Sequence, residues 1–357
     1  MNTGPRDSSP GSSAATASRE PMVRVEGLSR RFGERVAVAE LSFTVGRGEL
    51  FGLVGPDGAG KTTTLRMLAG VLRPSDGDAW IGTGPVGGDA ADSGAVRGRQ
   101  AEVGNVGAAA SVARQPEAVK RHLAYMSQRF GLYTDLTVRE NLAFYADLYD
   151  VPRRELPARL ERLFAFSGLG PFQERLAGQL SGGMKQKLGL SCALIHEPEL
   201  LLLDEPTFGV DPVSRRELWR IVHERVAEGV TAIVSTSYLD EAERFDRVAL
   251  LHEGRFLALD TPAALQRSLG EEVLEVRVDE PQRAREVLRD LSLVRRATAY
   301  GARLHVAVEP PAERAAAAVL AALREAGIEP GGIESVPPSL EDVFLARVEA
   351  TAAPVER

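Results

Sequence analysis

With 357 residues, the chain is longer than one typical domain and leaves room for one large core or two smaller cores. Its 44% hydrophobic and 26% charged content is that of an average globular protein, which excludes collagenous and disordered classes. The net charge of -7 offers no broad surface for a phosphate backbone, so no nucleic acid is expected as the main partner.

The sequence contains no stretch of about 18 or more apolar residues, the minimum for a membrane-spanning helix. If the protein acts at a membrane, another component must cross it. The single cysteine, Cys192, cannot form an internal disulfide and is expected to be a core residue in a reducing cytoplasm. Surface or packing roles, rather than metal binding, are expected for His122, His196, His223, His252 and His305.

The first half of the chain contains two low-complexity segments. Residues 1–20 lack the features of a signal peptide and predict a flexible tail. Residues 84–112, rich in Gly, Ala, Ser and Asp, predict a surface insertion. The expected elements between them are strands at Met22–Val25, Leu41–Val45 and Glu49–Val54, and a helix at Thr62–Ala69.

The second half begins with helical periodicity over Val138–Leu190, followed by apolar strand patterns at Leu200–Leu203 and Thr231–Ser235. After residue 270, the pattern predicts a β-α-β-β-α-β order, typical of a small ferredoxin-like domain. Its expected elements are a strand at Val273–Val278, helices at Gln282–Leu291 and Ala312–Ala326, and strands at Leu293–Tyr300, Leu304–Val308 and near Ile333. The alternative is a mixed extension packed on the main domain.

A glycine-rich loop between the strand at Glu49–Val54 and the following helix fits the P-loop pattern. Glycines let backbone N–H groups approach phosphate oxygens, and the new helix directs its positive end at them. Lys61 is expected to reach the β- and γ-phosphates, Thr62 to bind Mg²⁺ and Thr63 to add a phosphate contact. The nucleotide-binding set is Gly55, Pro56, Asp57, Gly58, Ala59, Gly60, Lys61, Thr62 and Thr63. A chance glycine-rich turn is the alternative.

Two further motifs predict phosphate chemistry. Asp204 and Glu205 end an apolar strand, where Asp204 is expected in the Mg²⁺ shell and Glu205 is expected to polarise the attacking water. A solvated turn is the alternative, which the P-loop disfavours. Ser181, Gly182 and Gly183 precede a helix and predict a second anion-binding helix start, although Ser-Gly-Gly also serves as a plain cap.

The order of P-loop, Gln128, Leu180–Gly183, Asp204–Glu205 and Gly209–Asp211 resembles the ABC ATPase family over residues 22 to about 260. The resemblance implies an α/β fold: a P-loop NTPase (RecA-like) core with an antiparallel β subdomain and a helical subdomain, plus a small C-terminal α+β accessory domain. The chain is most similar to drug-efflux ATPases, and to the first half of tandem two-ATPase exporters, at Gly55–Gly58, Gln128–Tyr133, Lys185–Lys187, Ser237–Glu241 and Pro338–Phe344.

The resemblance implies roles for further residues. Phe32 would stack on adenine, and Gln128 would join the Mg²⁺ and water network and sense the transmembrane partner. Ser181, Gly182 and Gly183 would bind the γ-phosphate held by an opposite subunit. Asp211 is assigned to the nucleotide-binding set. The implied catalytic residues are Glu205, Gln128 and Ser237, and the implied Mg²⁺ ligands are Thr62, Gln128 and Asp204.

The same resemblance implies an ATP-hydrolysing transporter subunit that works with ATP and Mg²⁺. Its expected partners are transmembrane permease subunits and a second ATP-binding subunit, in a homodimer or a heterodimer. Its expected location is cytoplasmic, peripheral on the inner face of the cell membrane. The expected domains are a tail at 1–20, an ATP-binding domain at 21–270 with a helical subdomain at 134–190, an accessory domain at 271–349 and a tail at 350–357.

Ser237 departs from the family pattern, because it occupies the position of the switch histidine. Serine is shorter and uncharged, so a contact with the γ-phosphate would be weakened or replaced by water. The hypothesis is a slow site on this chain's own P-loop, paired with an efficient site on a partner. A fully active homodimer, a weakly hydrolytic regulatory subunit and a soluble ABC protein of translation or DNA repair are the alternatives.

Overall fold

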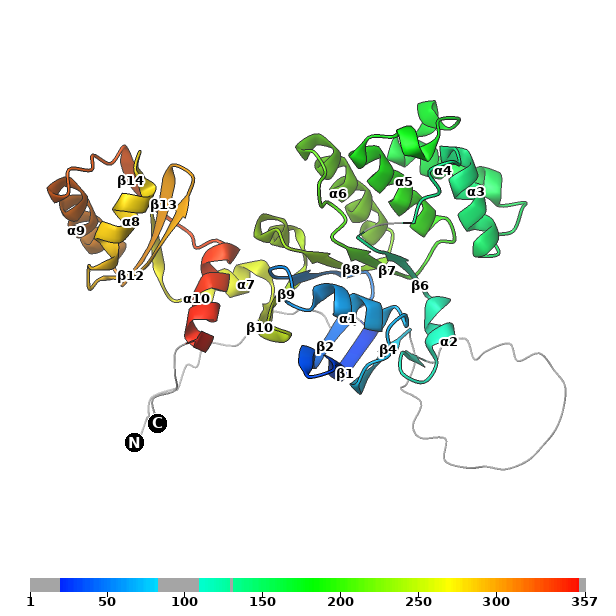
Figure 1. Cartoon of the computed structure of the whole chain (residues 1–357), viewed down its shortest axis with the longest axis horizontal. Coiled ribbons are helices and arrows are strands. Elements are labelled where there is room, and N and C mark those ends of the chain that lie inside the picture. Colours follow the sequence, from blue (N-terminus) through cyan, green and yellow to red (C-terminus); the bar gives the residue numbers. More distant parts are fainter. Residues whose placement is uncertain (1–19, 83–108, 129–130, 353–357) are drawn as a thin grey trace, which may run out of the picture. The chain divides into compact units, whose positions relative to one another are not determined.

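The computed structural model describes residues 20–82, 109–128 and 131–352 (Figure 1). Three predicted segments lie wholly or partly outside these ranges: residues 1–19 of the predicted tail at 1–20, residues 84–108 of the predicted insertion, and residues 353–357 of the second tail. The chain divides into two compact units, one of residues 1–49 and 63–233 and one of residues 50–62 and 234–357. Within the described ranges, no helix has the length and apolar character needed to cross a membrane.

The first unit contains an antiparallel sheet in the order β2-β1-β4-β5. Its strands are β1 (Pro21–Phe32), β2 (Arg35–Gly46), β4 (Asp76–Ile81) and β5 (Ala110–Ser111). β1 and β2 are longer than predicted, because bulges let β1 continue past Gly27 with a shifted register. Gly33, at φ 59°, makes the turn between the two strands and leaves Phe32 at the end of the hairpin.

The first unit also contains the predicted helical region. The elements of that region are α3 (Val138–Leu148), α4 (Leu156–Ser167), the 3-10 helices η1 (Gly170–Phe172) and η2 (Ala177–Gln179), and α5 (Gly182–Leu194). The same unit also contains most of α1 (Lys61–Leu68), α2 (Pro116–Lys120) and α6 (Pro212–Ala227). A capping box of Thr137 and Glu140 fixes the start of α3. The prediction of a mostly helical segment over Val138–Leu190 is confirmed.

Parallel strands place the functional loops of each unit. In the first unit the order is β6 (Leu123–Met126), β7 (Leu200–Asp204) and the start of β8 (Thr231–Thr236). In the second unit the end of β8 is followed by β3 (Leu50–Val54), β9 (Arg247–His252) and the antiparallel β10 (Arg255–Asp260). Gly52 lets β3 pass close to Phe245, whose ring would lie 2.3 Å from an added Cβ.

The second unit continues through η3 (Leu239–Arg244) and α7 (Pro262–Arg267) into the predicted ferredoxin-like domain. Its elements are β11 (Glu272–Arg277), α8 (Pro281–Arg289), β12 (Val294–Tyr300), β13 (Arg303–Val308), α9 (Ala312–Glu325) and β14 (Gly332–Val336). The sheet order is β12-β13-β11-β14, with every neighbour antiparallel. Leu274, Val276, Leu304 and Val306 belong to a buried hydrophobic core formed by these elements, which favours a separate small domain over a mere extension.

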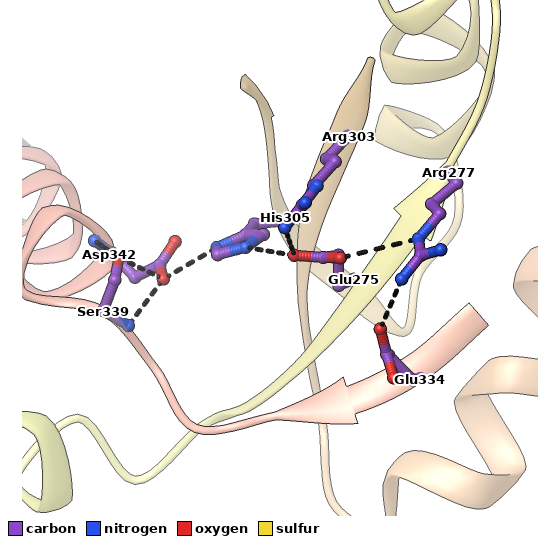
Figure 2. Close-up of polar contacts among 7 residues, drawn as sticks. All are labelled: Glu275, Arg277, Arg303, His305, Glu334, Ser339 and Asp342. Atoms are coloured by element: carbon purple, nitrogen blue, oxygen red, sulfur yellow. Dashed lines mark hydrogen bonds and ion pairs between the residues drawn. The ribbon is translucent and has the colours of Figure 1, made fainter. Parts of the chain in front are cut away.

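Charged side chains lie on β11, β13 and β14 of this domain at positions that alternate with its core residues (Figure 2). His305 Nδ1 lies 3.1 Å from Asp342 Oδ2, and its Nε2 lies 3.6 Å from Glu275 Oε2. Asp342 also accepts hydrogen bonds from the backbone and hydroxyl of Ser339 at the start of α10 (Leu340–Ala352). Because α10 also packs against α7, β10 and η3, the His305 contact connects the accessory sheet to the rest of this unit.

Candidate functional site

The P-loop connects β3 to α1 in a conformation that depends on glycine. Gly58 and Gly60 have φ values of 82° and 105°, which side-chain-bearing residues rarely adopt. A Cβ at Gly55 would lie 2.1 Å from the carbonyl oxygen of Leu251. α1 begins at Lys61, so backbone N–H groups at its start face the loop. The predicted order of strand, glycine loop and helix is confirmed.

Lys61 is the buried cation of this loop, with a relative exposure of 5%. Its Nζ donates hydrogen bonds to Gly55 O at 2.7 Å, Pro56 O at 3.0 Å and Ser237 Oγ at 3.1 Å. Burial of an ammonium group is costly unless oxygen atoms replace its water. These oxygens hold the charge at the start of α1, where an anionic phosphate would meet both the ammonium group and the helix dipole.

Ser237 follows β8 and lies against the same loop. Besides accepting from Lys61, its hydroxyl donates to Asp57 Oδ1 at 3.3 Å. The adjacent backbone is fixed because Thr236 Oγ1 donates to Glu241 Oε2 at 2.7 Å and accepts from the N–H of Tyr238 at 3.0 Å. The residue at the switch position therefore contacts P-loop side chains directly, and the pairing with Asp57 was not predicted.

Two buried carboxylates end β7, as the sequence predicted. Asp204 and Glu205 have relative exposures of 1% and 4%. Glu205 has a φ of 50°, in the left-handed region that costs energy for a residue with a side chain. Such strain concentrates at functional sites, where the surrounding structure holds it in place.

Tyr125 is a polar partner of this strand tip that sequence reasoning missed. Its hydroxyl donates to Asp204 Oδ2 at 3.2 Å. Burial, and secondarily the charge of Asp204, raise the pKa of Tyr125 to about 12, with Arg66 opposing the shift. The hydroxyl is therefore protonated at neutral pH and acts as a donor. The available signal was its place in the strand that ends just before Gln128.

The carboxylate of Asp204 fits Mg²⁺ that is bound together with a nucleotide. Among the residues that the structure describes, no group of three or more His, Cys, Asp or Glu side chains is placed to hold a metal ion. Mg²⁺ is usually bound by one or two carboxylates together with substrate phosphates. The buried carboxylate of Asp204 at the end of β7 suits that mode, in which the phosphates of ATP supply the remaining ligands.

The Ser-Gly-Gly motif begins α5 in the first unit. Ser181 caps this helix by accepting a hydrogen bond from the N–H of Met184 at 3.3 Å, and it is exposed together with Gly182. Gly183 is buried, and a Cβ there would lie 2.3 Å from Ser214 Oγ. The motif thus serves as a helix cap in this subunit, with Ser181 and Gly182 exposed at the start of α5.

The start of α6 lies beside this motif. Asp211 caps α6 by accepting hydrogen bonds from the N–H groups of Val213 at 3.1 Å and Ser214 at 2.9 Å. These backbone donors, Ser214 first, lower the pKa of the Asp211 carboxyl. Since Gly183 approaches Ser214 closely, the two predicted motifs are neighbours within the first unit.

The remaining predicted residues lie at exposed positions of the first unit. Phe32 has a relative exposure of 47%, and the Arg30 guanidinium lies over its ring, 4.6 Å from the centroid. Gln128 is exposed just after β6. The predicted site residues are divided between the two units. The second unit contains Gly55–Thr62 and Ser237, and the first unit contains Phe32, Thr63, Gln128, Ser181, Gly182, Gly183, Asp204, Glu205 and Asp211.

Cys192 and the histidines are not among the predicted site residues. Cys192 is fully buried, and burial raises the pKa of its thiol. This result confirms the expected core position. His305 is the exception to a simple packing role, because its pKa is raised by the hydrogen bond to Asp342, against the effect of burial.

Separate parts of the chain match two protein families. Residues 38–208 match the family described as "ABC transporter", and residues 261–348 match the family described as "ATP-binding protein DrrA1-3-like, C-terminal domain". The chain is 35% identical to the "Nod factor export ATP-binding protein I" of Rhizobium sp. (strain N33) over 90% of its own length and 95% of that protein. It belongs to the family of ABC transporter ATP-binding proteins. The family consists of ATPases that drive transport, as the resemblance implied.

Two further similarities extend this assignment. The chain is 48% identical to the "Probable multidrug ABC transporter ATP-binding protein YbhF" of Escherichia coli (strain K12) over 70% of its own length, but it spans only 39% of that relative. A solved "Structure of ATP binding subunit of ABC transporter" matches 70% of the chain and 93% of the other chain, with a TM-score of 0.57 and 30% identity. The P-loop ABC ATPase fold is thus confirmed for the family domain.

Proposed function

We propose that this chain is the ATP-hydrolysing subunit of an ABC exporter and that it energises separate transmembrane permease subunits. The observation that carries the proposal is the buried Lys61 ammonium group, held by Gly55, Pro56 and Ser237 at the start of the P-loop helix. This arrangement places a fixed positive charge where a phosphate can replace carbonyl oxygens as its partner.

In this proposal, the P-loop residues Gly55–Thr63 hold the triphosphate and Phe32 stacks on the adenine. Thr62, Gln128 and Asp204 would hold Mg²⁺, which when bound neutralises charge on the β- and γ-phosphates. Glu205 would accept a hydrogen bond from the attacking water and direct it at the γ-phosphate. The burial of Glu205 supports this role, because a buried carboxylate is costly unless it faces a site, a cation or water.

A second ATP-binding subunit would complete the site. The exposed Ser181 and Gly182 would contact the γ-phosphate held by the P-loop of the opposite subunit, with Asp211 in the adjoining loop. The subunits could be identical or different. The support is that Ser181 is exposed at the start of α5, where hydroxyl and N–H groups favour an anion.

Ser237 sets the expected rate. A serine hydroxyl that is engaged with Lys61 and Asp57 reaches less far than an imidazole toward a γ-phosphate. We therefore expect slow hydrolysis at the site built on this chain's P-loop, with a faster site where the intact signature motif faces a partner that keeps its histidine. A weakly hydrolytic regulatory subunit is the second candidate, and Ser237 is the observation that favours it.

The transported molecule is proposed to be a drug or another small molecule, exported from the cell. The support is the name of the YbhF relative and the match of residues 261–348 to a DrrA-like C-terminal domain. The Nod factor export relative supports export without supporting a drug. The proposed location is the cytoplasmic face of the cell membrane, bound to the permease. A role in translation or DNA repair is disfavoured because these relatives are named for transport.

Co-purification of the tagged full chain with membrane proteins of its native cell, followed by a phosphate-release assay, tests the proposal. The expected result is capture of a permease and ATP hydrolysis that rises when a cargo is added. Phosphate release at the background rate of a Glu205→Gln control, with or without the permease, would favour the regulatory alternative instead.

A further inference from the structure

Three side chains of the first unit are connected by contacts, and one of them is the predicted Mg²⁺ ligand Asp204. Tyr125 on β6 donates its hydroxyl hydrogen to Asp204 Oδ2 at 3.2 Å. Arg66, on the helix that follows the P-loop, interacts with the same phenol, by a hydrogen bond and by charge. The three residues therefore connect the P-loop helix, the strand leading to Gln128 and the tip of β7.

The sheet register explains how these side chains meet. β6 and β7 are parallel, with Tyr125 paired to Leu202. Paired residues of neighbouring strands share a face, and residues two apart in one strand also share a face, so Tyr125 and Asp204 lie on the same side of the sheet. The Tyr125 side chain extends along the neighbouring strand β7 from Leu202 to Asp204, which brings its hydroxyl to the carboxylate.

This hydrogen bond distinguishes the two carboxylate oxygens of Asp204. Oδ2 is an acceptor for the phenol, which fixes the rotation of the carboxylate plane. A carboxylate held in this way presents its other oxygen in one direction at little further entropic cost. Asp204 is almost fully buried, so water offers little competition for the bond.

We propose that Tyr125 is a positioning residue for Asp204 and sets the Mg²⁺ dependence of ATP binding and hydrolysis. This inference rests on the ATPase function proposed above and names a residue that acts through Asp204 rather than on the nucleotide. Outer partners of metal-binding carboxylates generally affect metal affinity without forming part of the first coordination shell. Tyr125 also gives the strand before Gln128 a direct contact with the metal-binding carboxylate.

The test uses the full chain with Tyr125→Phe, which removes the hydroxyl and keeps the ring. Phosphate release is measured against Mg²⁺ concentration at saturating ATP, and ATP affinity is measured separately in EDTA. We expect the Mg²⁺ concentration for half-maximal turnover to rise about tenfold, with unchanged affinity in EDTA. The stabilisation of the ATP complex by Mg²⁺, read as a rise in unfolding temperature, should shrink in parallel. Tyr149→Phe, whose ring stacks on His196, is the matched control and should match the wild type in every assay.

A double-mutant cycle with Asp204→Asn separates positioning from general structure. If Tyr125 acts through Asp204, Tyr125→Phe adds no further change in the Asp204→Asn background. An unchanged Mg²⁺ requirement in Tyr125→Phe, or an equal effect with and without the Asp204 carboxylate, would overturn the inference. Tyr125→His keeps a ring N–H donor and should give an Mg²⁺ requirement between those of the wild type and Tyr125→Phe. This variant replaces Tyr125→Phe in the test if Tyr125→Phe does not fold. A wild type that binds no ATP at all would instead overturn the proposed function.

Discussion

Lys61 Nζ and Ser237 Oγ lie 3.1 Å apart, although 176 positions separate the two residues in the sequence. The ammonium group of the P-loop and the residue at the switch position therefore belong to one hydrogen-bonded group, to which Asp57 also contributes. Any change at residue 237 is consequently expected to act on the P-loop itself.

Ser237→His is expected to raise ATP turnover at this chain's site by about tenfold, because a positioned imidazole that contacts the γ-phosphate stabilises transition-state charge. The turnover rate is measured as steady-state phosphate release by the purified subunit. Ser237→Ala is the control, because it removes the hydroxyl without adding a ring. Brisk, cooperative turnover by the wild type alone, without gain in the histidine variant, would rule out the slow-site hypothesis.

Glu205→Gln is expected to lower turnover by at least about a hundredfold while ATP affinity stays near that of the wild type, because the amide cannot accept the proton of the attacking water. With hydrolysis blocked, the variant should remain bound to ATP and accumulate as a dimer, which light scattering detects. Glu228→Gln, which alters an ion-paired carboxylate at the end of α6, is the control. Loss of ATP binding in Glu205→Gln would assign this residue to binding instead.

Gly183→Ala is expected to destabilise the first unit by about 1–3 kcal/mol, because its methyl group would overlap Ser214 at the start of α6. Gly182→Ala is the matched control, since a Cβ there meets the carbonyl oxygen of Gly209 at an ordinary 3.8 Å. Chemical unfolding of both variants distinguishes them. Equal stability of the two would mean that α5 and α6 do not pack as described.

His305 is expected to make stability depend on pH. The hydrogen bond to Asp342 raises the pKa of His305, so the protonated form stabilises the fold. That contribution is complete below the unfolded value of about 6.5 and is lost as pH rises through the higher folded pKa. His305→Gln should therefore cost about 1–2 kcal/mol near pH 6 and less near pH 9.

Unfolding of the full chain at the two pH values measures this difference. Asp342 sets the acid limit: burial opposes its charge, but hydrogen bonds from His305 and Ser339 lower its pKa. The pair is thus strongest between the two folded pKa values. The exposed His223 on α6 provides the control variant His223→Gln, which should show the same pH profile as the wild type. A difference in unfolding free energy between His305→Gln and the wild type that is the same at both pH values would contradict the ion pair.

Local patterns in the sequence predicted much of the fold. The P-loop, the strand ending at Asp204 and the β-α-β-β-α-β order after residue 270 depend on periodicity and on glycine positions, which lie within short segments. The start of α1 at Lys61 rather than Thr62, and of α8 at Pro281 rather than Gln282, are small differences at helix ends, where boundaries are weakly determined.

Contacts between distant segments could not be predicted in the same way. Tyr125 has no motif of its own, and its role depends on the register of β6 against β7. The pairing of Ser237 with Asp57 depends on the arrangement of β8 and the P-loop. The ion pairs of His305 depend on the fold of the accessory sheet and on the start of α10. Each is a tertiary relationship between residues that no local pattern connects.

ATP affinity and turnover of Lys61→Ala, measured with the full chain beside wild type, test the central claim most directly. Lys120→Ala, which removes an exposed lysine paired with Glu117, controls for the loss of charge. The ATPase account predicts that Lys61→Ala loses at least about a hundredfold in turnover and binds ATP more weakly, while Lys120→Ala behaves as wild type. Wild-type affinity and turnover in Lys61→Ala would contradict it.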